Sequence, residues 1–384
     1  MINCRWKIAI SSPSNSSPTA AKAAPRGYKA WLPRLKQSFF KTLTQLRLRL
    51  SEREALPQLI LLAVIVGLLS GGIIISFRLA ISALELALLG GSGTLGFTNL
   101  PVWARFTLPL AGAGLLYFLF RKGETVGVVH VMERLAYHQG RLPLTNAVKQ
   151  FFGACIAIVT GHSVGREGPS AHLGAAAASL AGQQLRLPNA TIRTLVGSGV
   201  AAAIAASFNT PLAGVIFAVE VVLLEYTVLS MAPVITAAVS AAWFTHIVYE
   251  AENVFAVDPL QWTSNWEVPY LLALGLIVGL LARAFNETVE RITRRTRDRS
   301  MLTRFLLAGL IIGSVGTIFP EVMGMGYSLL SDSLNGQLAL LFCISIVLIK
   351  LLVTASAVGL GLPGGLIGPT LVVGALAGHA MGLA

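Results

Sequence analysis

Gly165-Arg166-Glu167-Gly168-Pro169 interrupts a long region of small and apolar residues, and the interruption indicates how this chain folds. Two glycines and a proline break a helix that runs through them, and two opposite charges stand among apolar neighbours. In an apolar surrounding, such a break is tolerated only where protein or a watery cavity satisfies the freed backbone groups. The stretch therefore predicts a broken helix packed inside a bundle of other helices.

The composition places that bundle in a membrane. Of the 384 residues, 54% are hydrophobic and only 12% are charged, whereas soluble domains carry about 25% charged residues. Several apolar runs reach the roughly 17 to 25 residues that a helix needs to cross hydrocarbon. These runs are 56–77, 211–229, 271–285 with its flanks, and 338–360. We expect an all-α integral membrane protein in contact with a lipid bilayer.

Apolar periodicity and its breakers predict a series of helices, many of them too short to cross straight. The region 153–207 is rich in glycine and alanine, which let helix backbones approach closely. We therefore expect tilted and broken helices. The predicted segments are 56–78, 104–121, 126–139, 145–160, 167–184, 190–206, 211–229, 231–250, 269–291, 302–318, 336–356 and 366–383.

The net charge of +12 comes mainly from the first 55 residues and from 291–304. Nucleic acid is not an expected partner, because no aromatic stacking platforms are interleaved with these charges. By the positive-inside rule both basic segments face the cytoplasm. We assign 1–54 to a cytoplasmic tail with an amphipathic helix at 32–50, and 55–384 to a transmembrane domain. A transit peptide in the first 30 residues is the less favoured reading.

The interrupted stretch has an echo later in the chain, at Gly365-Leu366-Ile367-Gly368-Pro369. Chance matching of small residues in a glycine-rich chain is one reading of the echo. The other is an internal repeat, in which two short helices begin near the bilayer midplane and aim their N-termini at one site. We favour the repeat because Gly174 and Gly374 continue the match.

A pair of helix starts suits an anion. The first N–H groups of a helix are unpaired and carry about half a positive charge. Such partial charges attract an anion without holding it as tightly as a full cation would, so it can still leave. The glycines of both stretches let the backbone approach the ion, and the prolines fit the first turn of a helix. The repeated stretch therefore predicts an anion pathway.

Glu167 places a negative group beside helix starts that attract negative groups. Its carboxylate can occupy the place of the anion as a tethered gate, and protonation would release it. The alternative is a local pair between Glu167 and Arg166 that holds the break together. A mainly structural role is the favoured one for Arg166.

Three motifs in order resemble the ClC family of voltage-gated chloride channels and chloride/proton antiporters. They are 165–169, the run 199–220 with its Ala-Ala-Ala and Pro-Leu-Ala-Gly segments, and 363–369. The resemblance extends from about residue 55 to the end of the sequence. It implies chloride transport through an inverted-repeat bundle, with one pore in each subunit of a homodimer and Glu167 as the gate.

The resemblance also implies where the anion binds and where the protein resides. It implies no cofactor besides the transported chloride, and a bacterial inner membrane with the N-terminus in the cytoplasm. The anion-binding positions that it implies are Val126, Gly127, Gly165, Arg166, Gly168, Pro169, Leu366, Ile367 and Gly368.

The sequence departs from the family at several positions. Val126 stands where the family supplies a serine hydroxyl, and Ile367 stands where an aromatic residue is expected. Proton-coupled members carry an inner glutamate at the place of Val221, and the preceding Glu220 is the candidate substitute on a proton pathway. A chloride/proton antiporter, or a carrier of fluoride or nitrate, therefore remains an alternative to a chloride channel.

The family continues through several more helices after the position of Ala384. We expect a truncated sequence that lacks one wall of the pore and part of the dimer interface.

Two other functions are less favoured. Gly161-His162-Ser163-Val164-Gly165 matches the pattern of a hydrolase nucleophile, but that pattern needs a preceding strand and a separate Asp and His. We expect no enzyme activity and no catalytic residue. A non-transporting scaffold would leave Glu167 unexplained, because a charge in the bilayer centre costs at least about 2.5 kcal/mol. His162 and His172 are expected to be packed helix residues, and no metal site is predicted.

Overall fold

The computed structural model describes residues 44–45, 48, 50, 56–91, 93–123, 125, 127–249, 265 and 267–383. Every regular element among them is helical, which confirms the all-α prediction. From Leu46 to Ala384 the chain forms one compact unit. The tail helix predicted at 32–50 lies almost wholly outside the described residues, so the boundary at residue 54 stays a prediction.

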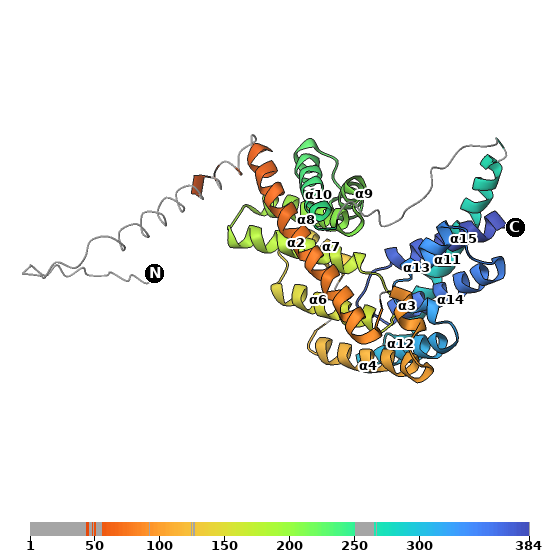
Figure 1. The fold of residues 1–384 in the computed structure, drawn as a ribbon. Helices are drawn as coiled ribbons and strands as arrows, with labels where there is room; N and C mark the ends of the chain where they lie inside the picture. The colour runs from red at the N-terminus through yellow and green to blue at the C-terminus, as the bar shows by residue number, and fades with distance from the viewer. Residues whose placement is uncertain are drawn as a thin grey trace, which may run out of the picture. The chain divides into compact units, whose positions relative to one another are not determined.

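The helices fall into two series along the chain (Figure 1). The first series is α2 Leu56–Leu89, α3 Gly93–Thr98, α4 Val102–Phe120, α5 Val128–Tyr137, α6 Leu144–Val159, α7 Glu167–Gln184, α8 Asn189–Phe208, α9 Pro211–Phe217, the π-helix η1 Ala218–Leu223 and α10 Val228–Tyr249. The second series is α11 Glu267–Thr296, α12 Met301–Ile318, the 3-10 helix η2 Pro320–Val322, α13 Tyr327–Leu334, α14 Leu340–Gly359 and α15 Ile367–Leu383.

Seven of the described helices are long and apolar enough to cross a membrane, namely α2, α4, α8, α10, α11, α12 and α14. Their surroundings differ strongly. The apolar window of α8 is 83% buried within the protein, whereas that of α11 is only 6% buried. A helix that is apolar all round and uncovered by protein needs an apolar solvent. The described helices thus form a membrane bundle with α8 inside it and α11 on its outer surface.

The centre of the first series is built by close contact between helix backbones. The helix α8 packs against α7, α2 and α10 (Figure 1). A methyl group added at Gly174 of α7 would lie 2.2 Å from the carbonyl oxygen of Gly199 in α8, and one added at Gly199 would lie 2.3 Å from that of Gly174. Only glycine allows this approach, as the prediction for region 153–207 requires.

The two halves break their helices in the same way, which confirms the internal repeat. Two residues after the last residue of α6 and of α14 stands a glycine with positive φ, 88° at Gly161 and 83° at Gly361. In each case the N–H of this glycine donates to the carbonyl three residues earlier, and the next N–H donates to the carbonyl five residues earlier. This is the Schellman pattern of a helix end. A link of seven residues then leads into the next helix in each half, 160–166 before α7 and 360–366 before α15.

Most helix predictions hold to within a few residues, and four need correction. The first span extends beyond 78 to Leu89, because Arg78 continues the helix and donates to the carbonyl of Ala206 at 3.3 Å. The segment predicted at 211–229 ends at Leu223, where Leu224 takes a left-handed conformation with φ of 56°. The helix predicted at 269–291 continues to Thr296, and the helix predicted from 336 begins at Leu340. The short helices α3 and α13 were not predicted.

Candidate functional site

The two breaks meet in the interior of the unit. Gly165 and Gly365 form an antiparallel bridge in which each N–H donates to the other residue's carbonyl oxygen at 2.7 Å. The bridge satisfies backbone groups that the breaks leave free, as a buried location demands. It also places the starts of α7 and α15 side by side. The predicted convergence of two helix starts on one site is therefore present.

Glycine is required at this meeting because backbone packs against backbone. A methyl group added at Gly365 would lie 2.5 Å from the nitrogen of Gly168, and one added at Gly168 would lie 2.9 Å from the Cα of Gly365. Neither neighbour can move without shifting a main chain. These glycines thus keep the two helix starts close together.

Glu167 is the first residue of α7, and its side chain is fully buried. Its carboxylate reaches across to the second half of the protein. The oxygen Oε2 accepts the backbone N–H of Gly368 in the first turn of α15 at 3.1 Å. The oxygen Oε1 accepts the hydroxyl of Tyr327, the first residue of α13. A negative oxygen thus already occupies the helix start that the sequence predicts as an anion site.

Arg166 is buried beside Glu167 but does not pair with it. Its Nη2 donates to the carbonyl of Ser207 at 3.5 Å, and its guanidinium carbon lies 5.3 Å from the ring centre of Tyr327. Its Nε has no hydrogen-bond partner among the described residues. These contacts agree with the structural role expected for Arg166, and the alternative Glu167–Arg166 pair is not formed.

The remaining predicted residues of the two stretches surround the bridge. Pro169 and Gly368 are buried in the first turns of α7 and α15. Leu366 is 38% exposed, and Ile367 is the first residue of α15. Both side chains are apolar, so these residues offer only backbone groups to an anion. An aromatic ring is absent at Ile367, as the sequence indicated.

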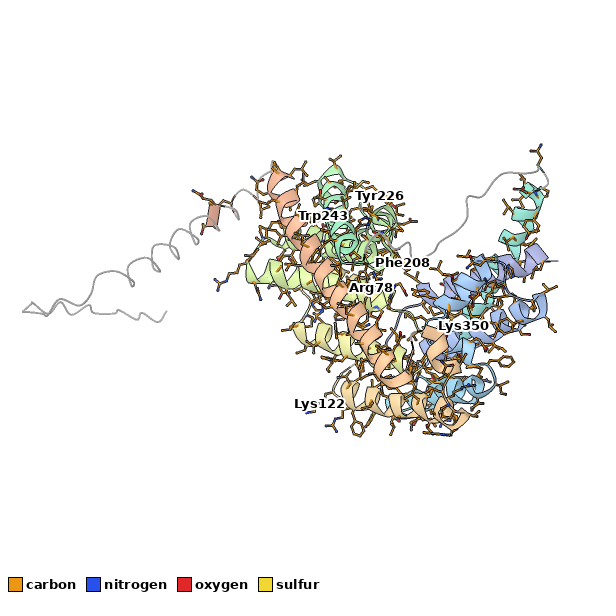
Figure 2. All side chains as sticks on the ribbon, in the orientation of Figure 1. Arg78, Lys122, Phe208, Tyr226, Trp243 and Lys350 are labelled. Atoms are coloured by element: carbon orange, nitrogen blue, oxygen red, sulfur yellow. The ribbon has the colours of Figure 1, made fainter. Side chains whose placement is uncertain are left out.

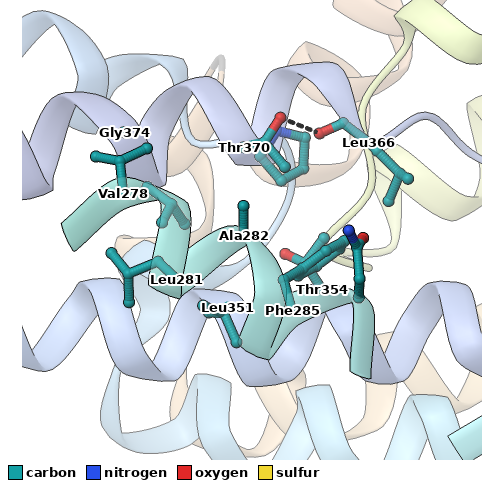
Figure 3. Close-up of a pocket in the computed structure, with 12 residues that line it drawn as sticks. Val278, Leu281, Ala282, Phe285, Leu351, Thr354, Leu366, Thr370 and Gly374 are labelled. Carbon is teal, nitrogen blue, oxygen red and sulfur yellow. Dashed lines mark hydrogen bonds between the residues drawn. The ribbon is translucent and has the colours of Figure 1, made fainter. Parts of the chain in front are cut away.

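An apolar cavity of about 250 Å³ adjoins the second break (Figure 3). Its walls come from α11, α14 and α15. Figure 3 shows Leu366 at one end and Val278 at the other, with Phe285 and Leu351 between the helices. Thr370 turns its hydroxyl to the carbonyl of Leu366 at 2.9 Å. The cavity thus offers few polar groups, unlike the side of the break where Glu167 lies.

The early motif occupies a different part of the structure. Val126 lies outside the described residues. Gly127 precedes α5 and lines a wide, partly open cavity. Its helix reaches α7 through His130, whose Nδ1 lies 3.1 Å from Nε2 of His172. The contacts described for Gly127 do not include the two breaks, so its predicted role in anion binding stays a prediction.

Glu220 lies on η1 and its side chain is exposed. The described contacts of Glu167 are with Tyr327 and Gly368, and Glu220 is not among them. Any proton path between the two glutamates therefore needs further groups. A π-helix at this point is unusual and often marks a functional segment.

The surroundings of Ser163 differ from those of a hydrolase nucleophile. The helix α6 precedes it in place of a strand. Its Oγ lies 2.8 Å from the hydroxyl oxygen of Thr354 on α14, so its partner is another hydroxyl and not a histidine. This pair of hydroxyls links the two halves near the bridge.

Two residues that the sequence did not single out contribute to the site. Tyr327 touches Glu167 from 160 positions away. Lys350 is fully buried on α14, and its Nζ donates to the carbonyls of Val322 at 2.9 Å and Gly324 at 2.8 Å. Figure 2 labels Lys350 among the helices of the second series. A lysine within an otherwise apolar run was a signal that the sequence offered.

The arrangement can hold a small anion at a helix start. It provides the backbone N–H of Gly368 and the hydroxyl of Tyr327, and no ion pair with the carboxylate of Glu167 is formed among the described residues. A group that occupies this place must accept hydrogen bonds and carry negative charge. Nothing in this set of contacts resembles a hydrolytic or metal-binding arrangement.

Comparison with known proteins agrees with this chemistry. A family model described as voltage gated chloride channel matches residues 108–384. The chain is 32% identical over 317 residues to a ClcB-like chloride channel protein of Ralstonia nicotianae, covering 79% of this chain and 74% of that protein. It is 29% identical over 340 residues to a voltage-gated ClC-type chloride channel, ClcB, of Escherichia coli, covering 84% and 81%.

Solved structures share the fold. A CLC-type fluoride/proton antiporter gives a TM-score of 0.69 at 24% identity, over 84% of this chain and 80% of that one. A slow cyanobacterial Cl⁻/H⁺ antiporter gives a TM-score of 0.73 at 20% identity, over 85% and 79%. At these identities the likeness bears on the fold alone.

Proposed function

This chain belongs to the voltage-gated chloride channel family, and from that membership we propose that it carries chloride across a membrane through the site where α7 and α15 begin. The names of its bacterial relatives support chloride as the ion. The breaks at Gly165 and Gly365 supply the pathway, and Glu167 is its gate.

One observation carries the proposal: Oε2 of Glu167 accepts the N–H of Gly368 at 3.1 Å in the first turn of α15. A carboxylate oxygen and a chloride ion bind to the same kind of protein group, because both are negative hydrogen-bond acceptors. The helix start that binds one therefore binds the other. Glu167 and chloride compete for a single place, so the pathway is closed while the carboxylate occupies it.

Release follows from the kind of donors that the site uses. A buried cation in direct contact would bind chloride too tightly, whereas helix N–H groups offer partial charges only. Protonation of Glu167 removes its negative charge and weakens the hydrogen bond that it accepts from the N–H of Gly368. Flux therefore increases as the pH falls, and the gate closes again as the pH rises.

The experiment is chloride efflux from liposomes that contain the purified chain, measured at acidic and neutral pH. Glu167→Gln keeps the shape of the side chain and removes its charge, so chloride flows at both pH values at a similar rate. Glu290→Gln is the matched control, because Glu290 is exposed on α11 and pairs with Arg294; it keeps the pH response of the wild type. An unchanged rate and pH response in Glu167→Gln would show that both pathway and gate are misassigned.

Chloride/proton exchange is a second candidate. Glu167 is buried and held by two donors, so its protonation and release can accompany each transported ion. Fluoride and nitrate remain candidate substrates, because Val126 offers no hydroxyl for selection among anions. Competition between these ions and chloride in the same liposomes ranks them directly.

We also propose the setting in which this transport takes place. The bacterial relatives and the basic flanks of the apolar helices favour an inner membrane with the N-terminus in the cytoplasm. A homodimer with one pathway in each subunit follows from the family. We keep 1–54 as a cytoplasmic tail and 55–384 as the transport domain, with no cofactor besides the transported ion.

A further inference from the structure

Tyr327 shares the space in front of α15 with the carboxylate of Glu167. A methyl group added at Gly368 would lie 3.3 Å from the hydroxyl oxygen of Tyr327, and 3.2 and 3.4 Å from the two oxygens of Glu167. A hydroxyl, a carboxylate and a helix start thus converge on one small volume. Two of these three groups are hydrogen-bond donors, and both donate to the third.

The residues around Tyr327 hold its hydroxyl toward the start of α15. Its ring packs against the apolar cores of both halves and beneath the guanidinium of Arg166. Gly326 precedes it with φ of 86°, a left-handed conformation that turns the chain into α13. The tyrosine side chain therefore has little freedom to turn away from the start of α15.

Lys350 fixes the loop that leads to Tyr327. It donates to the carbonyls of Val322 and Gly324, and the N–H of Gly324 donates in turn to the carbonyl of Gly161 at 3.1 Å. This ties the loop to the end of α6 as well as to α14. The place of the Tyr327 hydroxyl is thus set by groups from both repeats.

Withdrawal of Glu167 breaks the hydrogen bonds that its carboxylate accepts from the Tyr327 hydroxyl and the Gly368 N–H. The loss of buried hydrogen bonds is costly, and an anion in the vacated place accepts from both groups at once. We propose that Tyr327 is a ligand of the transported anion, which donates its hydroxyl to Glu167 in the closed state and to the anion in the open state. The proposal rests on the transport function and gate proposed above.

This role adds a hydroxyl that the early motif does not provide. Val126 stands at the position where the resemblance implies a serine. A phenolic O–H is a neutral donor, so it strengthens binding of a small anion without adding a full positive charge that would trap it. Tyr327 then belongs to the binding site together with the start of α15.

The test is chloride binding to the purified full chain in detergent, measured by calorimetry. Glu167→Ala vacates the place, and Tyr327→Phe is compared in that background. A hydrogen bond to an ion contributes enough that its loss weakens chloride binding by about tenfold or more. Tyr226→Phe is the matched control, because Tyr226 is exposed before α10, and it leaves the affinity unchanged in the same background.

A second measurement separates a ligand from a residue that only packs. Incorporation of 3,5-difluorotyrosine at 327 makes the phenol a stronger donor with little change in shape, so chloride affinity rises above that of Glu167→Ala alone. Equal affinity of Glu167→Ala with and without Tyr327→Phe overturns the Tyr327 proposal and leaves the gate intact. An absence of chloride binding in Glu167→Ala itself overturns the proposed function instead. Comparable thermal midpoints of the variants exclude misfolding as the cause of a loss.

Discussion

Gly165 and Gly365 occupy matching places in the two repeats, yet an added methyl group meets different neighbours at each. At Gly165 it would lie 2.2 Å from Oε2 of Glu167, the free end of a flexible side chain. Its next neighbours, at 3.1 Å, have to yield by only a few tenths of an ångström. We expect Gly165→Ala to expel the carboxylate from the start of α15 and to give chloride flux that no longer responds to pH.

The matched variant Gly365→Ala has a different expected outcome. Its methyl group would lie 2.5 Å from the backbone nitrogen of Gly168, which has no freedom to move alone. Overpacking of this kind lowers the free energy of unfolding by about 1–3 kcal/mol, or prevents folding. Liposome flux and thermal midpoints of both variants check the contrast. A pH response of the wild-type kind in Gly165→Ala would contradict the place assigned to Glu167.

The residues of the site differ in how far the sequence could predict them. Glu167 and its flanking glycines stand out because a charge and helix breakers are rare in an apolar run. Tyr327 does not stand out, because its contact with Glu167 joins positions 160 apart and depends on the packing of α13. The hydrophobic periodicity of the sequence does not predict a contact between positions so far apart. Lys350 could have been noticed as a lone charge, but its partners are backbone carbonyls without a sequence pattern.

The links between elements make Lys350 of α14 a positioning residue for Tyr327 of α13. Lys350→Met leaves the carbonyls of Val322 and Gly324 unsatisfied, which lowers the free energy of unfolding by about 1–3 kcal/mol. In the Glu167→Ala background it also weakens chloride binding. The further loss caused by Tyr327→Phe is then smaller than in the presence of Lys350, because both changes act through one hydroxyl.

A double-mutant cycle by calorimetry measures this coupling. Lys122→Met serves as the control, since Lys122 is exposed at the end of α4 and its effect adds to that of Tyr327→Phe. Full additivity of Lys350→Met and Tyr327→Phe would mean that Lys350 stabilises the loop without positioning the tyrosine. The thermal midpoint in detergent reports the stability loss separately from binding.

The breaks themselves are the best predicted elements. The bounds of α7 agree with the sequence prediction because Gly165, Gly168 and Pro169 mark its start by known backbone chemistry. The helix α13 escaped prediction because it is short and follows Gly324 and Gly326, which read as a loop. Its stability comes from packing against α15 and α3, which periodicity does not report.

Coupling of chloride to protons is a property of the whole molecule, because it requires a second titrating group that serves the opposite end of the pathway. The candidate is Glu220 on η1, since Val221 fills the place of the inner glutamate. Glu220 is exposed and lies outside the contacts of Glu167. No continuous set of described hydrogen bonds joins the two carboxylates. A channel and an exchanger are therefore both candidates.

The reversal potential of liposomes under combined chloride and proton gradients distinguishes the two. For a channel the potential follows the chloride gradient alone, and a change in the proton gradient at fixed chloride leaves it in place. Glu220→Gln then has no effect on the potential, whereas Glu167→Gln alters the rate only. A potential that shifts with the proton gradient means exchange. In that case Glu220→Gln must abolish the shift if Glu220 is the inner proton carrier, and a shift that survives assigns the role to another group.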